Sequence, residues 1–199
     1  MRILGINCMN HDAAMAVVEI KDGLGKILWA AHAERYSKIK NDHYLNQAIV
    51  DEAMTYGPFK KVVYYEKPWL KKTRQMYAGQ YGTALSYTEL PSWHLDHFGI
   101  KIDEYVKHHD SHAAAGYFTS PFREATILTV DAIGEWDTVS ISTAEKVWIE
   151  RKETIQYPHS IGILYSAFTH RCGLKPAEEE YILMGMAAYG KPKYKDQIY

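Results

Sequence analysis

The sequence has few cysteines and no long apolar run. Cys8 and Cys172 are its two cysteines in 199 residues, too few for a disulfide framework and without the paired spacing of a zinc site. A reducing compartment is the simplest interpretation of this usage. No stretch approaches the roughly 18 apolar residues of a transmembrane helix, and the apolar start is too short for a signal peptide. We therefore expect a cytoplasmic protein with no membrane partner.

The sequence also lacks an excess of either charge. It has 23 Lys and Arg against 24 Asp and Glu, a formal net charge of −1. Because there is no basic stripe, we do not expect nucleic acid as a partner. Walker A, Rossmann glycine and Gly-x-Ser-x-Gly patterns are missing as well. Polar aromatic and imidazole side chains are abundant, with 16 Tyr and 10 His.

The first part of the chain predicts an α/β arrangement that begins with an antiparallel meander. Short apolar runs are separated by turn residues, the pattern of consecutive hairpin strands. A helical spacing of apolar residues then ends at Gly57-Pro58. The expected elements are strands at 2–7, 13–20, 26–34 and 61–65, a charged loop at 35–41, and a helix at 45–56.

The rest of the chain starts with a weakly patterned segment. Residues 69–102 predict only a helix or two within a long excursion. After residue 125 the meander pattern starts again, with a tight turn expected near Ala144-Glu145. The expected elements are strands at 105–107, 125–131, 138–143 and 146–154, and helices at 110–119, 160–171 and 180–188.

The most informative motif is a pair of histidines at the start of a predicted helix. His108 and His112 are four residues apart, so both imidazoles lie on one face and can chelate one ion. Asp131 ends an apolar strand and is the natural third ligand. Such a set leaves coordination positions open and suits Fe(II), Zn or Mn. The alternative is that His112 packs beneath the helix while His108 and His109 lie at its solvated start.

Three further groups are candidates for ligand binding. His11 lies in a polar loop between two buried strands, where a ligand can approach the backbone, although an ordinary surface turn has the same composition. Arg35, Lys38 and Lys40 offer positive charge to an anion, or form a solvated loop. Gly134 lies in a predicted turn that can aim backbone N–H groups at a phosphate, a weak signal by itself.

Three ordered segments of the chain also carry a family resemblance. They comprise 3–7 with 11–14, 33–36 and Lys40; 108–114 with 120–122, 129–131 and 134–135; and 158–166 with 184–190. Together they resemble the O-carbamoyltransferase family, which includes nodulation protein U and the cephalosporin and tobramycin carbamoyltransferases. The resemblance spans nearly the whole chain.

The resemblance implies a fold and an activity. The fold is an α/β lobe of the actin/Hsp70/sugar-kinase (RNase H-like) type, a mixed sheet with a leading antiparallel meander and flanking helices. Residues 1–199 would be the amino-terminal lobe of a metal-binding module, with a second lobe and a carboxyl-terminal adenylate-forming domain absent from the chain. The implied reaction passes a carbamoyl group from carbamoyl phosphate, through an ATP-derived carbamoyl adenylate, to the hydroxyl of a small-molecule acceptor.

The same resemblance implies roles for individual residues. His108, His112 and Asp131 would bind the divalent metal, with Fe(II) preferred over Zn and Mn. His11 would accept the proton of the acceptor hydroxyl. The positions implied for ATP, phosphate or carbamoyl phosphate are Lys40, Gly134, Ser160 and Gly162. The chain departs from the family pattern at Ala132, Ile182 and Ala188, where glycine, lysine and proline are usual, and it has no counterpart of a second-lobe aspartate ligand.

Three hypotheses follow for the function. In the first, the chain is the amino-terminal part of an O-carbamoyltransferase, either a fragment or the product of a split or truncated gene. It is then incomplete as an enzyme by itself, and a second chain is one source of the missing lobe. In the second, it is a non-catalytic lobe that binds metal or nucleotide together with a partner chain. In the third, it is a relative of the tRNA threonylcarbamoyl transferases with another acceptor. Segments 120–122 and 184–190 favour the first.

Overall fold

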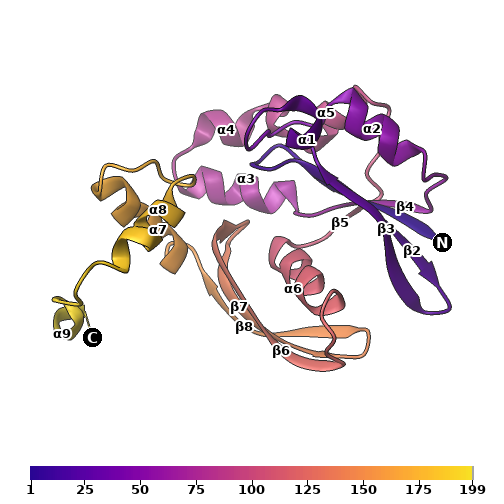
Figure 1. The fold of residues 1–199 in the computed structure, drawn as a ribbon. Helices are drawn as coiled ribbons and strands as arrows, with labels where there is room; N and C mark the ends of the chain where they lie inside the picture. The colour runs from indigo at the N-terminus through magenta and orange to yellow at the C-terminus, as the bar shows by residue number, and fades with distance from the viewer. Residues whose placement is uncertain (199) are drawn as a thin grey trace. The chain divides into compact units, whose positions relative to one another are not determined.

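The chain divides into two compact units. A computed structural model describes residues 1–198, and its first unit is Met1–Pro121, while the second begins at Phe122. Figure 1 follows the elements of each unit along the chain. Each unit is built around its own sheet.

The first unit is built on a five-stranded mixed sheet with the order β3-β2-β1-β4-β5. Strand β1 pairs antiparallel with β2 and parallel with β4. Side chains alternate along β1, where Leu4 and Ile6 point into the core. This sheet confirms the expected α/β lobe with its leading antiparallel meander. The strands are β1 Arg2–Asn7, β2 Ala14–Lys21, β3 Leu24–His32, β4 Lys61–Tyr64 and β5 Glu104–Tyr105.

Helices account for most of the remaining first unit. Helix α2 buries Ile49 and Ala53 in the same core as Leu4 of the sheet. The segment 69–102 is more helical than its weak periodicity predicts, and Pro68 and Pro91 begin two of its helices. The helices are α1 Glu34–Ser37, α2 Gln47–Met54, α3 Pro68–Tyr77, α4 Tyr81–Leu85, the 3₁₀ turn η1 Tyr87–Glu89, α5 Pro91–Asp96 and α6 His108–Phe118.

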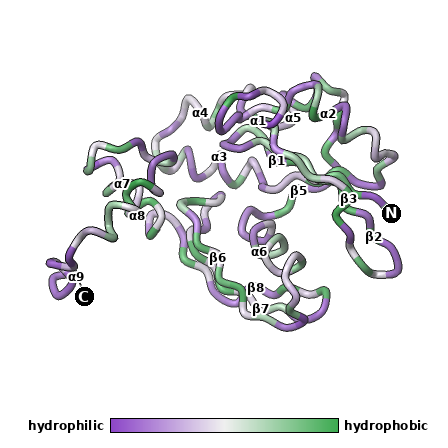
Figure 2. The backbone as a smooth tube through the Cα atoms, viewed as in Figure 1, coloured by the Kyte–Doolittle hydropathy of each residue, from purple (hydrophilic) through white to green (hydrophobic). Residues whose placement is uncertain are grey.

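The second unit repeats the meander as a three-stranded antiparallel sheet, β6-β7-β8. The turn expected near Ala144-Glu145 lies slightly further on, because Glu145 still pairs with Trp148 and Lys146 takes the left-handed conformation at φ 55°. Figure 2 shows the hydrophobic stretches along these strands. The elements are β6 Glu124–Gly134, β7 Asp137–Glu145, β8 Trp148–Gln156, α7 Ile161–Arg171, α8 Glu180–Ala187 and α9 Lys195–Ile198.

The described helices of the chain are short relative to the thickness of a bilayer. Spanning a membrane takes a helix of about 20 predominantly apolar residues. Within residues 1–198, every helix falls short of that length and hydrophobicity.

Candidate metal centre

Helix α6 brings His108 and His112 together in the first unit. The helix begins at His108, so the two histidines are one turn apart and face the same side. Their Nε2 atoms lie 3.0 Å apart. Ala113 and Tyr117 on α6 are buried, and Ser111 Oγ donates a hydrogen bond to the carbonyl of Tyr65 at 2.8 Å. These contacts fix the helix and therefore the imidazole pair.

The burial of the three clustered histidines contradicts the alternative packing expected from spacing alone. His108 is 7% exposed and His109 is 1% exposed, whereas His112 is exposed to solvent. The start of α6 is therefore the buried end, and His112 does not pack beneath the helix. This arrangement leaves one imidazole of the pair accessible from outside.

The imidazole pair has the chemistry and spacing of a divalent metal site. A transition metal binds an imidazole nitrogen at about 2.0–2.1 Å, so two such nitrogens on one ion lie about 3.0–3.4 Å apart. The observed distance of 3.0 Å between the Nε2 atoms fits this range. Imidazole suits Fe, Zn and related ions. Two neutral donors on α6 thus form half of a tetrahedral set or a third of an octahedral one.

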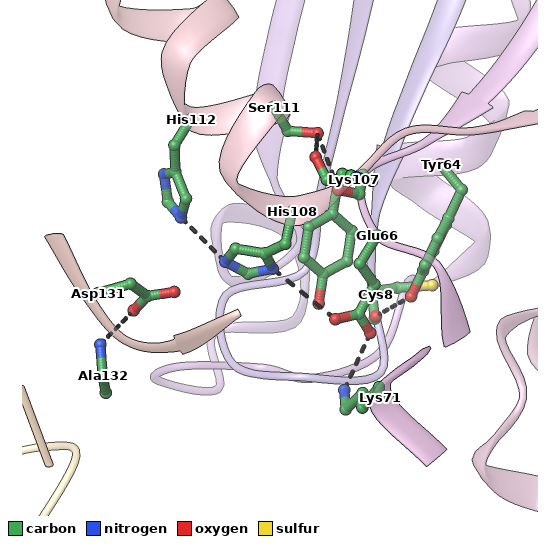
Figure 3. Close-up of polar contacts among 11 residues, drawn as sticks. Cys8, Tyr64, Glu66, Lys71, Lys107, His108, Ser111, His112, Asp131 and Ala132 are labelled. Carbon is green, nitrogen blue, oxygen red and sulfur yellow. Dashed lines mark hydrogen bonds and ion pairs between the residues drawn. The ribbon is translucent and has the colours of Figure 1, made fainter. Parts of the chain in front are cut away.

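A buried carboxylate lies behind His108. Glu66 follows strand β4, is 4% exposed, and places Oε2 at 3.7 Å from Nδ1 of His108. Its Oε1 accepts a hydrogen bond from Lys71 Nζ at 2.9 Å. Figure 3 shows His108 between His112 on one side and Glu66 on the other. The imidazole therefore has one nitrogen toward a carboxylate and the other toward its partner imidazole.

The environment keeps Glu66 ionised. Burial acts to raise the pKa of this carboxyl, but the adjacent His108 imidazole and the Lys71 ammonium outweigh it, and the pKa lies below its ordinary value. A buried carboxylate is stable only when it is paired and hydrogen-bonded. Glu66 meets this requirement through Lys71 at Oε1, while Oε2 lies beside the His108 ring at a distance longer than a hydrogen bond.

A cysteine near this centre is chemically inert. Tyr64 donates its hydroxyl to the carbonyl of Cys8 at 2.6 Å. Burial raises the pKa of the Cys8 thiol to about 12. The thiolate is the nucleophilic and metal-binding form, so Cys8 serves neither purpose at neutral pH. This agrees with the absence of a nucleophile signature in the sequence.

Asp131 belongs to the second unit, on strand β6. Its side chain is half-buried, and its carboxylate accepts a hydrogen bond from the backbone N–H of Ala132 at 2.7 Å. This local bond, drawn in Figure 3, holds the carboxylate beside the strand. Asp131 therefore has a defined orientation within its unit, in a strand that continues to Gly134 rather than ending at Asp131.

Ser160 and Gly162 lie against Asp131 and Ala132 in the same unit. Ser160 caps α7, accepting from Ile163 N at 3.0 Å and donating to the carbonyl of Ala132 at 2.7 Å. A Cβ built on Gly162 would come within 2.6 Å of the Ala132 Cα and 2.9 Å of the Asp131 carbonyl oxygen. Only glycine fits there without a shift. Both residues thus hold the start of α7 on strand β6.

The other three predicted site residues lie elsewhere in their units. His11 is exposed and places Nδ1 at 2.9 Å from the carboxylate of its neighbour Asp12. Lys40 is exposed in a turn after α1, and the next residue, Asn41, donates its N–H to Glu34 at 3.2 Å. Gly134 is buried and pairs with Asp137 as the end of β6. The left-handed residue of that turn is Glu135, at φ 60°.

Glu66 received no role from the sequence. The sequence signal that could have identified it is its position. Glu66 directly follows the apolar strand predicted at 61–65, much as Asp131 is the last residue of the apolar strand predicted at 125–131. In α/β sheets, ligands bind at the carboxyl ends of the strands, where polar side chains contact them. The contact with His108 joins residues 42 positions apart, and sequence periodicity does not report such contacts.

The chain is similar to a family model and to several known proteins. Residues 90–199 match a family model described as the carbamoyltransferase N-terminus. An uncharacterised protein of Synechocystis is 34% identical over 98% of this chain and 36% of its own length. Nodulation protein NolNO of Sinorhizobium fredii is 24% identical over 94% of this chain and 29% of its own length. The chain thus spans about a third of the length of these relatives.

Solved structures with a similar arrangement include two from Aquifex aeolicus. One is described as a PPX-GPPA enzyme, with a TM-score of 0.43 and 16% identity, covering 91% of this chain and 59% of that one. The other is a Ppx/GppA phosphatase, with a TM-score of 0.41 and 15% identity, covering 96% of this chain and 65% of that one.

Proposed function

Because this chain belongs to the carbamoyltransferase family through its N-terminal domain, we propose that it supplies the metal-binding half of a carbamoyl-transfer site. The reaction proposed is transfer of a carbamoyl group to the hydroxyl of a small-molecule acceptor, with carbamoyl phosphate and ATP as the sources of an activated carbamoyl adenylate. One observation carries the proposal: the 3.0 Å spacing of the His108 and His112 Nε2 atoms, within the matched segment. The chain spans about a third of its relatives, and a second chain or lobe completes the proposed enzyme.

The proposed ligands are His108, His112 and Asp131, with Fe(II) preferred over Zn and Mn. Two imidazoles and one carboxylate leave positions open for substrate oxygens. A bound divalent ion supplies Lewis-acid stabilisation of the negative charge on a phosphate leaving group.

His11 is proposed as the general base. Its Nδ1 faces the Asp12 carboxylate at 2.9 Å, so the tautomer with hydrogen on Nδ1 is favoured and the Nε2 lone pair is free to accept a proton. In the proposed reaction that proton comes from the acceptor hydroxyl. Asp12 orients the ring, because an imidazole held by a carboxylate presents its second nitrogen in one direction.

The remaining family positions are proposed to handle anions. Lys40 is exposed and offers an ammonium to a phosphate. Ser160 and Gly162 begin α7, where backbone N–H groups point out of the helix. The Ser160 hydroxyl is already bonded to Ala132 and Ile163, so the backbone there, together with Gly134, is the proposed contact for nucleotide or phosphate.

Metal content tests the proposal most directly. The 199-residue chain, loaded anaerobically with Fe(II), or with Zn or Mn, is expected to retain about one equivalent by elemental analysis. His108→Ala and His112→Ala should each remove most of it, and Asp131→Ala should weaken retention less. His32→Ala, which changes an exposed histidine of β3, is the matched control and should retain the metal.

Two results would contradict the metal assignment. One is a wild-type chain that retains none of the three metals. The other is equal loss from His108→Ala, His112→Ala and a folded His109→Ala. Metal-dependent binding of carbamoyl phosphate, measured by titration calorimetry, would then favour a carbamoyl-transfer site over a lobe that binds only metal or nucleotide.

A further inference from the structure

We propose that Glu66 is a positioning residue that orients His108 for metal binding. The inference rests on the proposed metal role of His108, and it adds a residue that the family resemblance did not supply. Glu66 does not reach the ion in this proposal. It acts through the imidazole, as an outer-shell carboxylate does in many histidine metal sites.

The first observation is that the two carboxylate oxygens of Glu66 have different neighbours. Oε1 accepts from Lys71 Nζ at 2.9 Å, and Oε2 faces Nδ1 of His108 at 3.7 Å. Lys71 thus occupies Oε1 and leaves Oε2 as the oxygen beside the ring. Glu66 and His108 are 4% and 7% exposed, so this geometry is shielded from water.

The second observation concerns the opposite side of the ring. His108 Nε2 points at His112 Nε2, which places the two nitrogens of His108 in different environments (Figure 3). A neutral imidazole carries hydrogen on one nitrogen and a lone pair on the other. A carboxylate beside Nδ1 favours hydrogen on Nδ1, which leaves the Nε2 lone pair directed toward His112 and available to a cation.

Lys71 keeps this carboxylate in place. Its ammonium lies on the side of Glu66 away from the ring (Figure 3) and balances the buried negative charge. Without that balance a buried carboxylate would bind a proton or turn to solvent. Lys71 belongs to α3, Glu66 to the loop after β4, and His108 to the start of α6. The contacts that orient the imidazole therefore link these three elements.

The test combines a spectroscopic signature with a binding constant. The full chain, with ¹⁵N-labelled histidine and no metal, reports the tautomer of His108 by imidazole nitrogen NMR, with His108→Ala assigning the signals. Zn²⁺ affinity is measured by competition with a chelating dye. Glu66→Ala is expected to shift His108 away from the Nδ1–H tautomer and to weaken Zn²⁺ binding about 10–100-fold, the usual effect of losing an outer-shell partner.

Two further variants make the test specific. Glu66→Gln keeps an oxygen acceptor of nearly the same shape, so it should retain the tautomer and lose less affinity than Glu66→Ala. Glu104→Gln removes an exposed carboxylate paired with Lys61 at 2.6 Å in the same unit, and it should leave both readouts unchanged. If Glu66→Ala fails to fold, Zn²⁺ affinity decides: Glu66→Gln should bind Zn²⁺ more weakly than Glu104→Gln, and equal affinities would overturn the positioning role.

The outcomes separate the two proposals. An unchanged tautomer and unchanged Zn²⁺ affinity in the Glu66 variants would overturn the positioning role. A lowered melting temperature with an unchanged tautomer would overturn it as well, since that is the mark of a purely structural residue. A wild-type chain that binds no Zn²⁺, Fe(II) or Mn would instead overturn the metal assignment, while the tautomer shift would still show that Glu66 orients His108.

Discussion

The two units of the chain bury different kinds of side chain. The first unit has a continuous apolar core that includes Leu4, Ile49 and Leu95. Among the described residues of the second unit, Ala144 is the sole apolar side chain below 9% exposure. Its most buried side chains are polar, with Thr138, Ser140 and Thr169 at 0–1% exposure, while Leu128 and Val130 of β6 are 64% and 51% exposed.

This difference shows what holds the predicted ligands within each unit. The imidazole pair and Glu66 are attached to a unit with its own hydrophobic core, the main source of folding free energy. Asp131 lies on a sheet held by ladder hydrogen bonds and by polar contacts such as Thr138 Oγ1 to the carbonyl of His159 at 2.6 Å. Net contributions of such bonds are small, about 0.5–1.5 kcal/mol each. The first unit is therefore the one expected to hold its site geometry unaided.

Separating the units gives the largest expected effect and would break this comparison most directly. Residues 1–121 alone should unfold in a cooperative thermal transition with a dispersed NMR spectrum, because the apolar core lies within them. Residues 122–199 alone should show no cooperative transition. Circular dichroism melts of the two fragments and the full chain measure this. A sharp transition in the second fragment would show that its polar interior is sufficient.

A substitution at Gly162 sharpens the comparison by testing a contact within the second unit. Gly162→Ala places a Cβ within 2.6 Å of the Ala132 Cα, so it should destabilise the chain by about 1–3 kcal/mol, as overpacking usually does. Gly185→Ala is the matched control in α8, where a Cβ meets nothing within 4 Å. The control should stabilise by about 0.5–1 kcal/mol. Urea denaturation measures both, and equal effects would mean that α7 is free to move away from β6.

The smallest expected effect is a pH dependence of the first unit. His94 accepts a hydrogen bond from Leu45 N at 3.0 Å, and burial, with the nearby His97, lowers its pKa below the ordinary value. Below about pH 6.5 the unfolded chain binds a proton that the folded imidazole resists. This contribution to stability is thus present above about pH 6.5 and is lost as the pH falls toward the lowered pKa.

The measurement compares melting temperatures at pH 7.5 and 5.5. His94→Gln keeps an acceptor for the Leu45 amide but does not titrate, so the variant should lose less stability on acidification than the wild type. His32→Gln, on an exposed histidine of β3 that is distant in sequence from His94, is the control. The same acid-induced change in wild type and His94→Gln would remove His94 from the explanation.

Much of the fold was predictable because its pattern is local. The meander of β1 to β3 follows from short apolar runs separated by turns, and the periodicity of 45–56 located α2 to within two residues at each end. The helices of segment 69–102 could not be placed from the sequence, because they are short and expose aromatic side chains such as Tyr77 and Tyr81. Hydrophobic periodicity does not detect such helices.

In the candidate site, too, the local features were predictable from the sequence and the features that depend on distant residues were not. The spacing of His108 and His112 is a local property of α6, and it correctly predicted that the two imidazoles meet. Which of them is buried depends on residues distant in sequence, such as Glu66. The turn predicted at Gly134 follows directly after it, because strand pairing with Asp137 extends β6 through Gly134. The roles of His11, Lys40, Gly134, Ser160 and Gly162 stay predictions.

The burial of Cys8 also simplifies the surface chemistry of the chain. With its thiol fully shielded and protonated, the chain presents a single reactive thiol, because its other cysteine, Cys172, is exposed. Cys172 directly follows the last residue of α7. A maleimide dye or spin label therefore attaches at one place in the second unit without any cysteine being removed. The native chain is in this sense ready for single-site fluorescence or electron-spin measurements of how that unit moves.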